Sequence, residues 1–331
     1  MEKTISEKEK NLLEIRNLTV HYVTVDGTVR AVENLNLTVA PGETLGLVGE
    51  TGAGKTTTVK AVMRILPHPP AEIVSGEILF DGRDVLTLSN KEMRKIRGKQ
   101  ISMIFQDPMT SLNPVMTVRS QIVEAIRLHN KISHRAAVER ANQMLEMVGI
   151  RSERGDNYPH QFSGGMKQRV VIAMALACSP KLLIADEPTT ALDVTIQAQV
   201  LELMKQLKQS LNTSMIMITH DLGIVAEICE RIAIMYAGQI IEIGSREEIF
   251  HRPSHPYTKG LFACIPNILD EDSTLIPIHG LPPDPTHLPT GCRFAPRCSQ
   301  RKDACLRHNP EMLELEKGHF VRCPFVSRGE K

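Results

Sequence analysis

The sequence predicts an α/β fold, and three observations lead to this prediction. A glycine-rich segment occupies residues 49–57, between an apolar run and a helical run. Two further segments, residues 181–186 and 214–219, contain the uninterrupted apolar stretches 182–185 and 215–218, which are typical of parallel strands buried on both faces. Residues 117–148 carry apolar positions at helical spacing with little β pattern. These features indicate a parallel sheet with a helical insert.

The glycine-rich segment has the composition of a phosphate-binding P-loop. It reads Gly49-Glu50-Thr51-Gly52-Ala53-Gly54-Lys55-Thr56-Thr57. An apolar strand at residues 44–48 precedes it, and a helical run at 57–66 follows it. Glycines let several backbone N–H groups converge on one anion, and the helix N-terminus adds partial positive charge. Lys55 is expected to reach the β and γ phosphates, and the Thr56 hydroxyl to bind Mg²⁺.

Length and composition restrict the class of protein. The chain has 331 residues, enough for two domains, with 42% hydrophobic and 23% charged residues and a net charge of +1. The small net charge gives no strong electrostatic field that would attract nucleic acid. The sequence has no apolar run of about 18 residues, the length needed to span a bilayer. The charged N-terminus lacks a signal-peptide pattern, so we expect a cytosolic protein. Tryptophan is absent, which disfavours a surface on which the bases of a single-stranded nucleic acid could stack.

Residues 12–48 alternate apolar segments with turns and are expected to form antiparallel strands. The breaks lie at Asp26-Gly27 and Pro41-Gly42. Tyr22 lies in one of these strands. It either stacks on an adenine ring or is an ordinary strand aromatic, and the pattern leaves both open.

A second anion-ready helix start follows the helical insert. Ser163 is a good N-cap, and Gly164 and Gly165 leave the backbone bare before a helix over residues 166–178. A plain capped helix is the alternative. Gln106, which ends an apolar strand at 101–105, can bind a metal or a water through its side-chain amide.

Two carboxylates end the apolar run at 181–186. Charges at the carboxyl end of a parallel strand lie where α/β sheets bind ligands. Asp186 suits the water shell of Mg²⁺, and Glu187 suits polarising an attacking water. His220 ends the run at 214–219 and is a candidate contact for the γ-phosphate.

Four of the seven cysteines crowd into the last forty residues: Cys292, Cys298, Cys305 and Cys323. Their spacings lack the close C-x2-C pairs usual for zinc. Four thiolates suit either Zn²⁺ or a [4Fe–4S] cluster, and His319 makes a Cys3His zinc site conceivable. Unligated cysteines are disfavoured, because a proline-rich tail with little apolar periodicity needs a staple to fold.

Taken in order, these motifs resemble those of ABC-transporter ATPase subunits over residues 12–250. The stretch from Phe162 to Arg169, which includes Gln168, matches the family's signature, with Phe162 where leucine is commoner. The resemblance implies a P-loop NTPase fold with a RecA-like core, an antiparallel β subdomain and a helical subdomain at about 107–178. It also implies that two such domains pair head to tail. Each ATP then lies between the P-loop of one domain and the Ser163-Gly164-Gly165 stretch of the other.

The resemblance also implies residue roles. Tyr22 is the adenine-stacking aromatic, Gln106 the metal and coupling-loop residue, and Glu187 the catalytic base. His220 is the γ-phosphate switch.

The tail is similar to the C-terminal extension of dipeptide and oligopeptide importer ATPases, most closely the D-type subunit of dipeptide importers. His255-Pro256-Tyr257 and the four cysteines carry this resemblance. In relatives the four cysteines hold an iron–sulfur cluster, so we favour a [4Fe–4S] cluster over Zn²⁺. The expected organisation is a tail at residues 1–11, an ATPase domain at 12–250 and an extension at 251–331.

The implied function is an ATPase that powers a membrane importer of peptides. Its partners are two permease subunits and a second ATPase subunit, which is expected to be a sibling, with a second copy of this chain as the alternative. An extracellular peptide-binding protein is an indirect partner. The expected location is the cytoplasmic face of the membrane. Alternatives are a nickel or other small-solute importer, a soluble ABC-type ATPase of DNA repair or translation, and a non-catalytic iron–sulfur module.

Overall fold

The computed structural model describes residues 11–190, 192–264 and 277–326. Residues 1–10 of the expected tail at 1–11, and Ala191, lie outside the described residues. By their internal contacts the residues divide into two compact units. The first takes the described parts of 1–14, 38–44 and 79–219, and the second those of 15–37, 45–78 and 220–331.

The first unit contains three parallel strands in the order β8-β7-β6. Their bounds are β6 Ile101–Ile104, β7 Leu182–Asp186 and β8 Ser214–Thr219. Every residue of β7 and of β8 is buried, which explains why these runs are apolar without alternation. The prediction of parallel strands is confirmed. The short strand β5 (Arg83–Asp84) pairs with the end of β4 (Ala71–Phe80).

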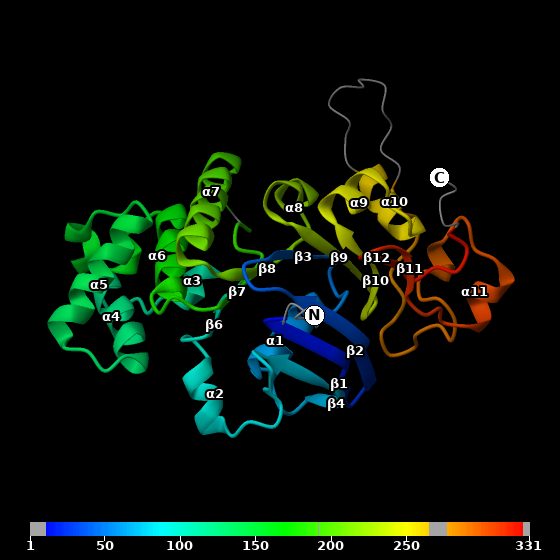
Figure 1. The fold of residues 1–331 in the computed structure, drawn as a ribbon, viewed down its shortest axis with the longest axis horizontal. Coiled ribbons are helices and arrows are strands. Elements are labelled where there is room, and N and C mark those ends of the chain that lie inside the picture. Colours follow the sequence, from blue (N-terminus) through cyan, green and yellow to red (C-terminus); the bar gives the residue numbers. More distant parts are fainter. Residues whose placement is uncertain (1–10, 191, 265–276, 327–331) are drawn as a thin grey trace, which may run out of the picture. The chain divides into compact units, whose positions relative to one another are not determined.

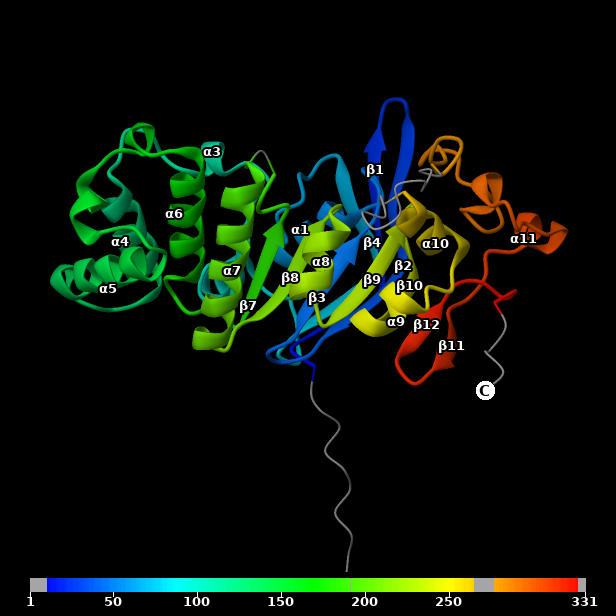
Figure 2. The ribbon, with the colours of Figure 1, turned by 90° about the horizontal axis from the view of Figure 1, so that it is seen from above.

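The helices of the first unit are α2 Asn90–Ile96, α3 Pro108–Ser111, α4 Val118–His129, α5 His134–Met147, α6 Gly164–Leu176 and α7 Val194–Leu211. Two 3-10 turns, Ser152–Asp156 and Pro159–Gln161, precede α6. Side chains of Thr117 and Ser133 cap α4 and α5, and the helical spacing predicted over residues 117–148 is confirmed. Figures 1 and 2 show α4, α5 and α6 gathered into one helical group.

The second unit contains a sheet in the order β11-β12-β10-β9-β3 and most of a smaller sheet in the order β2-β1-β4. The bounds are β1 Leu13–Thr24, β2 Gly27–Val39, β3 Thr44–Val48, β9 Arg231–Tyr236, β10 Gln239–Ser245, β11 Leu313–Glu316 and β12 His319–Val321. β3 runs parallel to β9, whereas β10, β11 and β12 continue antiparallel.

The helices of the second unit are α1 Lys55–Met63, α8 Leu222–Ile228, α9 Arg246–His251, α10 Pro256–Ala263 and α11 Asp303–Arg307. A 3-10 turn occupies Ala295–Arg297. In both views α9 and α10 lie next to the β9–β10 hairpin (Figures 1 and 2). No helix among the described residues is both long and apolar enough to cross a bilayer.

Candidate nucleotide site and cysteine cavity

The P-loop of the second unit leads from β3 into α1, as predicted. The N-cap of α1 is Gly54, which offers no side chain to the first N–H groups of the helix. Gly54 has a φ of 102°, and a Cβ at this position would lie 2.4 Å from the carbonyl oxygen of Ala31. Glycine is therefore required here, and the bare helix start is suited to an anion.

Lys55 lies along the inside of this loop. The Lys55 Nζ donates hydrogen bonds to the carbonyl oxygens of Gly49, at 2.6 Å, and Glu50, at 3.0 Å. Lys55 as a whole is only 7% exposed. The Tyr22 hydroxyl lies 3.3 Å from the hydroxyl of Thr57. The structure thus places the predicted Tyr22 beside the predicted loop, while its role toward adenine stays a prediction.

The first unit brings together the predicted Gln106 and Glu187. The Gln106 Nε2 donates to the Glu187 Oε2 over 2.9 Å, and the Thr190 hydroxyl donates to the same oxygen over 3.0 Å. Glu187 has a φ of 48°, a left-handed conformation that is costly for a residue with a side chain. Asp186, at the end of β7, is 3% exposed. Two carboxylates of different exposure therefore stand at the carboxyl end of a buried strand.

The predicted second helix start also lies in the first unit. The Ser163 hydroxyl accepts a hydrogen bond from the Met166 N–H and so caps α6. A Cβ at Gly165 would lie 2.4 Å from Cγ2 of Ile196, so this glycine permits the close packing of α6 against α7. Gln168 is fully buried and donates to the Pro188 carbonyl oxygen. Its predicted role toward nucleotide stays a prediction, as do those of Ser163, Gly164 and Gly165.

All four predicted cysteines line one cavity of about 380 Å³ in the second unit, together with Phe294, His308 and Arg322, among others. Burial raises the pKa of Cys292, Cys298 and Cys323 above the ordinary thiol value. Within the described part of the chain, no three His, Cys, Asp or Glu side chains lie close enough together to hold a single metal ion.

Known proteins share these features. Residues 32–190 match the ABC transporter family, and residues 241–305 match the C-terminal region of oligopeptide/dipeptide transporters. The chain is 53% identical to the oligopeptide transport ATP-binding protein OppD of Bacillus subtilis, over 94% of this chain and 88% of that protein. It is 51% identical to the dipeptide transport ATP-binding protein DppD of the same organism, over 95% and 94%.

The chain belongs to the oligopeptide/dipeptide family of ABC-transporter ATP-binding proteins. A solved dimer of the ATP-binding cassette MJ0796, in a post-hydrolysis state with ADP and Pi, is 27% identical with a TM-score of 0.64. It covers 71% of this chain and 98% of that cassette. The P-loop fold of an ABC ATPase is thereby established for this chain.

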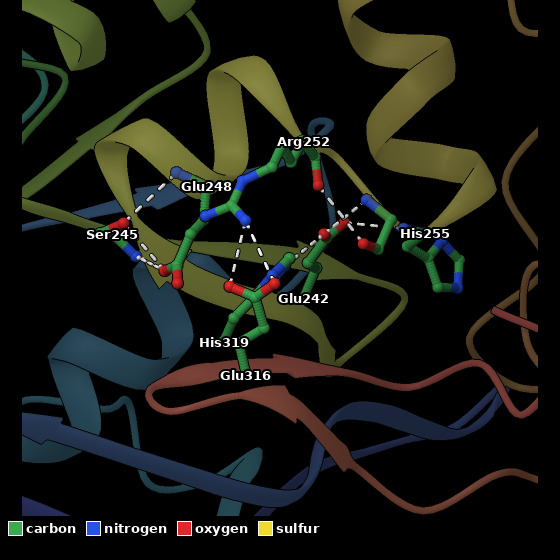
Figure 3. Close-up of polar contacts among 8 residues, drawn as sticks. Glu242, Ser245, Glu248, Arg252, His255, Glu316 and His319 are labelled. Atoms are coloured by element: carbon green, nitrogen blue, oxygen red, sulfur yellow. Dashed lines mark hydrogen bonds and ion pairs between the residues drawn. The ribbon is translucent and has the colours of Figure 1, made fainter. Parts of the chain in front are cut away.

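In this ABC ATPase, His319 is not among the residues that line the cysteine cavity, so the structure does not bring together the residues of the Cys3His alternative. The ring is buried and its Nε2 lies 2.9 Å from the Glu242 Oε1 (Figure 3). Glu242 also accepts hydrogen bonds from the backbone N–H groups of Ser254 and His255. Burial acts to raise the pKa of Glu242, but these hydrogen bonds, led by that from His319, outweigh it and lower that pKa.

Sequence reasoning missed the contacts that the extension makes around the P-loop. The Arg297 Nη1 donates to both carboxylate oxygens of Glu50, at 3.1 and 2.9 Å. The Glu50 N–H donates to the Tyr257 hydroxyl over 3.2 Å. The available signal was an arginine placed between two cysteines, but nothing in the local pattern indicates its distant partner.

Proposed function

We propose that this chain is the ATP-binding and ATP-hydrolysing subunit of an ABC importer of dipeptides or oligopeptides. The observation that carries the proposal is the 53% identity over 94% of the chain, because the match includes the extension as well as the ATPase motifs. The P-loop geometry supports ATP as the ligand, since a bare helix start and a buried lysine suit a polyphosphate.

The chain's own residues supply the chemistry. Lys55 holds the β and γ phosphates, and Thr56, with Gln106 and Asp186, holds Mg²⁺ and its water shell. Glu187 accepts a proton from the attacking water, while His220 senses the γ-phosphate. The hydrogen bonds from Gln106 and Thr190 support this role for Glu187, because they orient its carboxylate. Tyr22 stacks on adenine.

The ATPase works in a pair. A homologous sibling subunit, or a second copy, supplies the signature stretch equivalent to residues 163–165, so this chain hydrolyses ATP poorly by itself. ATP closes the pair and hydrolysis reopens it, which drives two permease subunits. The chain is a peripheral protein at the cytoplasmic face of the membrane. It does not contact the extracellular peptide-binding protein directly, so the effect of bound peptide reaches this chain only through the permease subunits.

The cysteine cavity takes a [4Fe–4S] cluster in this account. Zinc needs its sulfur ligands about 2.3 Å from one point, and no such group of three occurs in the described chain. A four-iron cluster spreads its four cysteine ligands over a larger volume, which fits thiols that share a cavity of about 380 Å³. When bound, the cluster would cross-link the four cysteines and so stabilise the fold of the extension.

Affinity purification of the full chain from membranes tests this function. We expect two permease subunits and a sibling ATPase to accompany it, with peptide stimulating ATP hydrolysis by the assembly once the binding protein is added. Stimulation by nickel instead of peptide, or recovery of the chain without any permease, would overturn the proposal. Iron and zinc are quantified in the same anaerobic sample, where zinc without iron would refute the cluster.

A further inference from the structure

The segment between the first two cysteines, Cys292–Cys298, has two faces. Cys292 and Cys298 line the cysteine cavity. Arg293 and Phe294 are 5% and 4% exposed, although an arginine is rarely so deeply buried. Arg293 donates to the Ala237 carbonyl oxygen and forms an ion pair with Glu33. The segment is thus fixed on strand β2 and on the turn between β9 and β10 rather than lying loosely on the surface.

Arg297 extends this fixation to the P-loop. Its side chain is 6% exposed, and it binds both carboxylate oxygens of Glu50, the second residue of the P-loop. The same Nη1 donates to the Tyr236 hydroxyl over 3.3 Å. Charge-assisted hydrogen bonds of this kind, shielded from water, are among the strong ones. The position of Glu50 therefore depends on that of Arg297.

The backbone of Glu50 depends on the same segment. Its N–H donates to the hydroxyl of Tyr257, whose ring centroid lies 4.6 Å from that of Tyr236 and 5.4 Å from that of Phe294. Its carbonyl oxygen accepts a hydrogen bond from Lys55, the phosphate-binding lysine. A continuous set of contacts therefore leads from Cys292 and Cys298 through Phe294 and Arg297 to Glu50 and Lys55.

We propose that Arg297 is a positioning residue that couples the cysteine cavity to nucleotide binding. When the four thiols are held in place, the Cys292–Cys298 segment keeps Glu50, and with it the P-loop, in the conformation that binds phosphate. Linkage makes the coupling reciprocal, so bound nucleotide must in turn hold Cys292 and Cys298 more firmly. This proposal rests on the proposed function, because it takes the P-loop as a nucleotide site.

Calorimetric binding of MgADP to the full chain as purified tests the forward direction. We expect Arg297→Gln to weaken MgADP binding about fivefold or more, the usual lower range of a coupling between sites, and Arg297→Lys to recover part of the loss. The matched control is Arg252→Gln, which removes the ion pair between Arg252 and Glu316, another arginine–carboxylate pair of the extension. This pair is exposed: the Arg252 side chain is 56% exposed and the Glu316 side chain 59%. This control should bind MgADP like the wild type.

The possible failures are distinguishable. Wild-type protein that does not bind MgADP refutes the nucleotide site itself. Wild-type binding that Arg297→Gln leaves unchanged refutes only the coupling. If Arg297→Gln does not fold, Glu50→Gln probes the same contact from the P-loop side, with the same expected weakening and the same contrary outcome.

The reverse direction is read from the rate at which a maleimide modifies each cysteine while an iron chelator removes the cluster, resolved by mass spectrometry. MgADP should slow modification of Cys292 and Cys298 in the wild type, and Arg297→Gln should abolish that protection. Cys264, an exposed cysteine outside the cavity, is the internal control and should react equally with and without MgADP. Equal rates at Cys292 and Cys298 with and without MgADP in the wild type would overturn the coupling.

Discussion

Glu187 is held in one position by features that a merely solvated carboxylate would not need. Its backbone has a φ of 48°, and its N–H donates to the Ile218 carbonyl oxygen in β8. Gln106 and Thr190 both donate to one carboxylate oxygen. Strained backbone positions are concentrated at functional sites, where the surrounding structure maintains them. The geometry therefore supports the proposed role of Glu187 as general base.

Replacing this carboxylate by an amide tests the role. Glu187→Gln keeps the size of the side chain but removes the proton acceptor, so ATP hydrolysis by the assembled transporter should fall about a hundredfold or more. ATP binding should persist, and the closed pair should accumulate. Hydrolysis is measured as phosphate release, and bound ATP by filtration.

Lys55→Ala is the matched comparison for that variant. It removes the proposed phosphate contact rather than the proposed base, so nucleotide affinity itself should fall. Hydrolysis by Glu187→Gln at the parent rate would show that the base lies elsewhere.

His255 gives the protein a specific dependence on pH. Burial lowers the pKa of this histidine from 6.5 to about 4. Between pH 6.5 and about pH 4, His255 is therefore protonated in the unfolded chain but neutral in the folded chain. Protons then favour the unfolded state, so the folded protein loses stability as the pH falls below 6.5. We expect this residue to cost about 2 kcal/mol of unfolding free energy between pH 7 and pH 5.

His255→Asn isolates this effect, because asparagine is also a good N-cap and the His255 Nδ1 caps α10 by accepting the Tyr257 N–H. Urea unfolding of the two proteins at pH 7, 6 and 5 gives the comparison. The variant should show the shallower dependence on pH. Parallel curves for the two proteins would contradict the assignment. Glu242 affects the stability of the protein only at more acidic pH, because its pKa is lowered from 4.5. Its stabilising contribution is lost as the pH falls through that lowered pKa.

At the scale of elements, the C-terminal hairpin β11–β12 is attached to β10 by a short ladder and one buried pair. Glu242 and Ile243 are in register with Val321 and Phe320. The side chain of Glu242 is fully buried and bonded to His319, at the start of β12. Because a ladder this short offers few backbone hydrogen bonds, the Glu242–His319 pair should contribute strongly to holding the hairpin.

His319→Ala should therefore loosen the hairpin selectively. Removing one partner of a buried pair typically costs about 3 to 5 kcal/mol, so amide exchange across residues 313–321 should accelerate about a hundredfold or more. Hydrogen exchange with mass spectrometry measures this, and α1 and β3 serve as reference segments.

Arg252→Gln is the control here too, because it removes the exposed pair between Arg252 and Glu316 of the same hairpin (Figure 3). Exposed pairs contribute about 0 to 1 kcal/mol, so exchange should change little. Equal acceleration by His319→Ala and Arg252→Gln would contradict the importance of the buried pair.

At the scale of the molecule, the local patterns predicted the elements well. The strands at 44–48 and 214–219 match β3 and β8, and Ser163 caps α6 as expected. These features depend on residues that are neighbours in sequence, where periodicity and capping rules apply. Among the site residues, the P-loop and the Gln106–Glu187 pair follow from motifs whose order is specific.

The contacts of the extension could not be predicted in the same way. Arg297 binds Glu50, 247 positions away, and His319 binds Glu242, 77 positions away. Neither pair leaves a periodic signal, and His319 was instead a plausible metal ligand by its residue type. The hairpin β11–β12 was missed because its strands have only four and three residues, too few for the apolar and acidic alternation of Leu313–Glu316 to stand out.

In the whole assembly, ATP hydrolysis by this chain is proposed to power the import of peptides. The direct measurement is accumulation of a labelled dipeptide or oligopeptide in vesicles that contain the purified transporter and its binding protein, with MgATP on the side of this chain. We expect accumulation that requires ATP and is lost with Glu187→Gln. Peptide accumulation that is equal with and without ATP, or unchanged by Glu187→Gln, would contradict it.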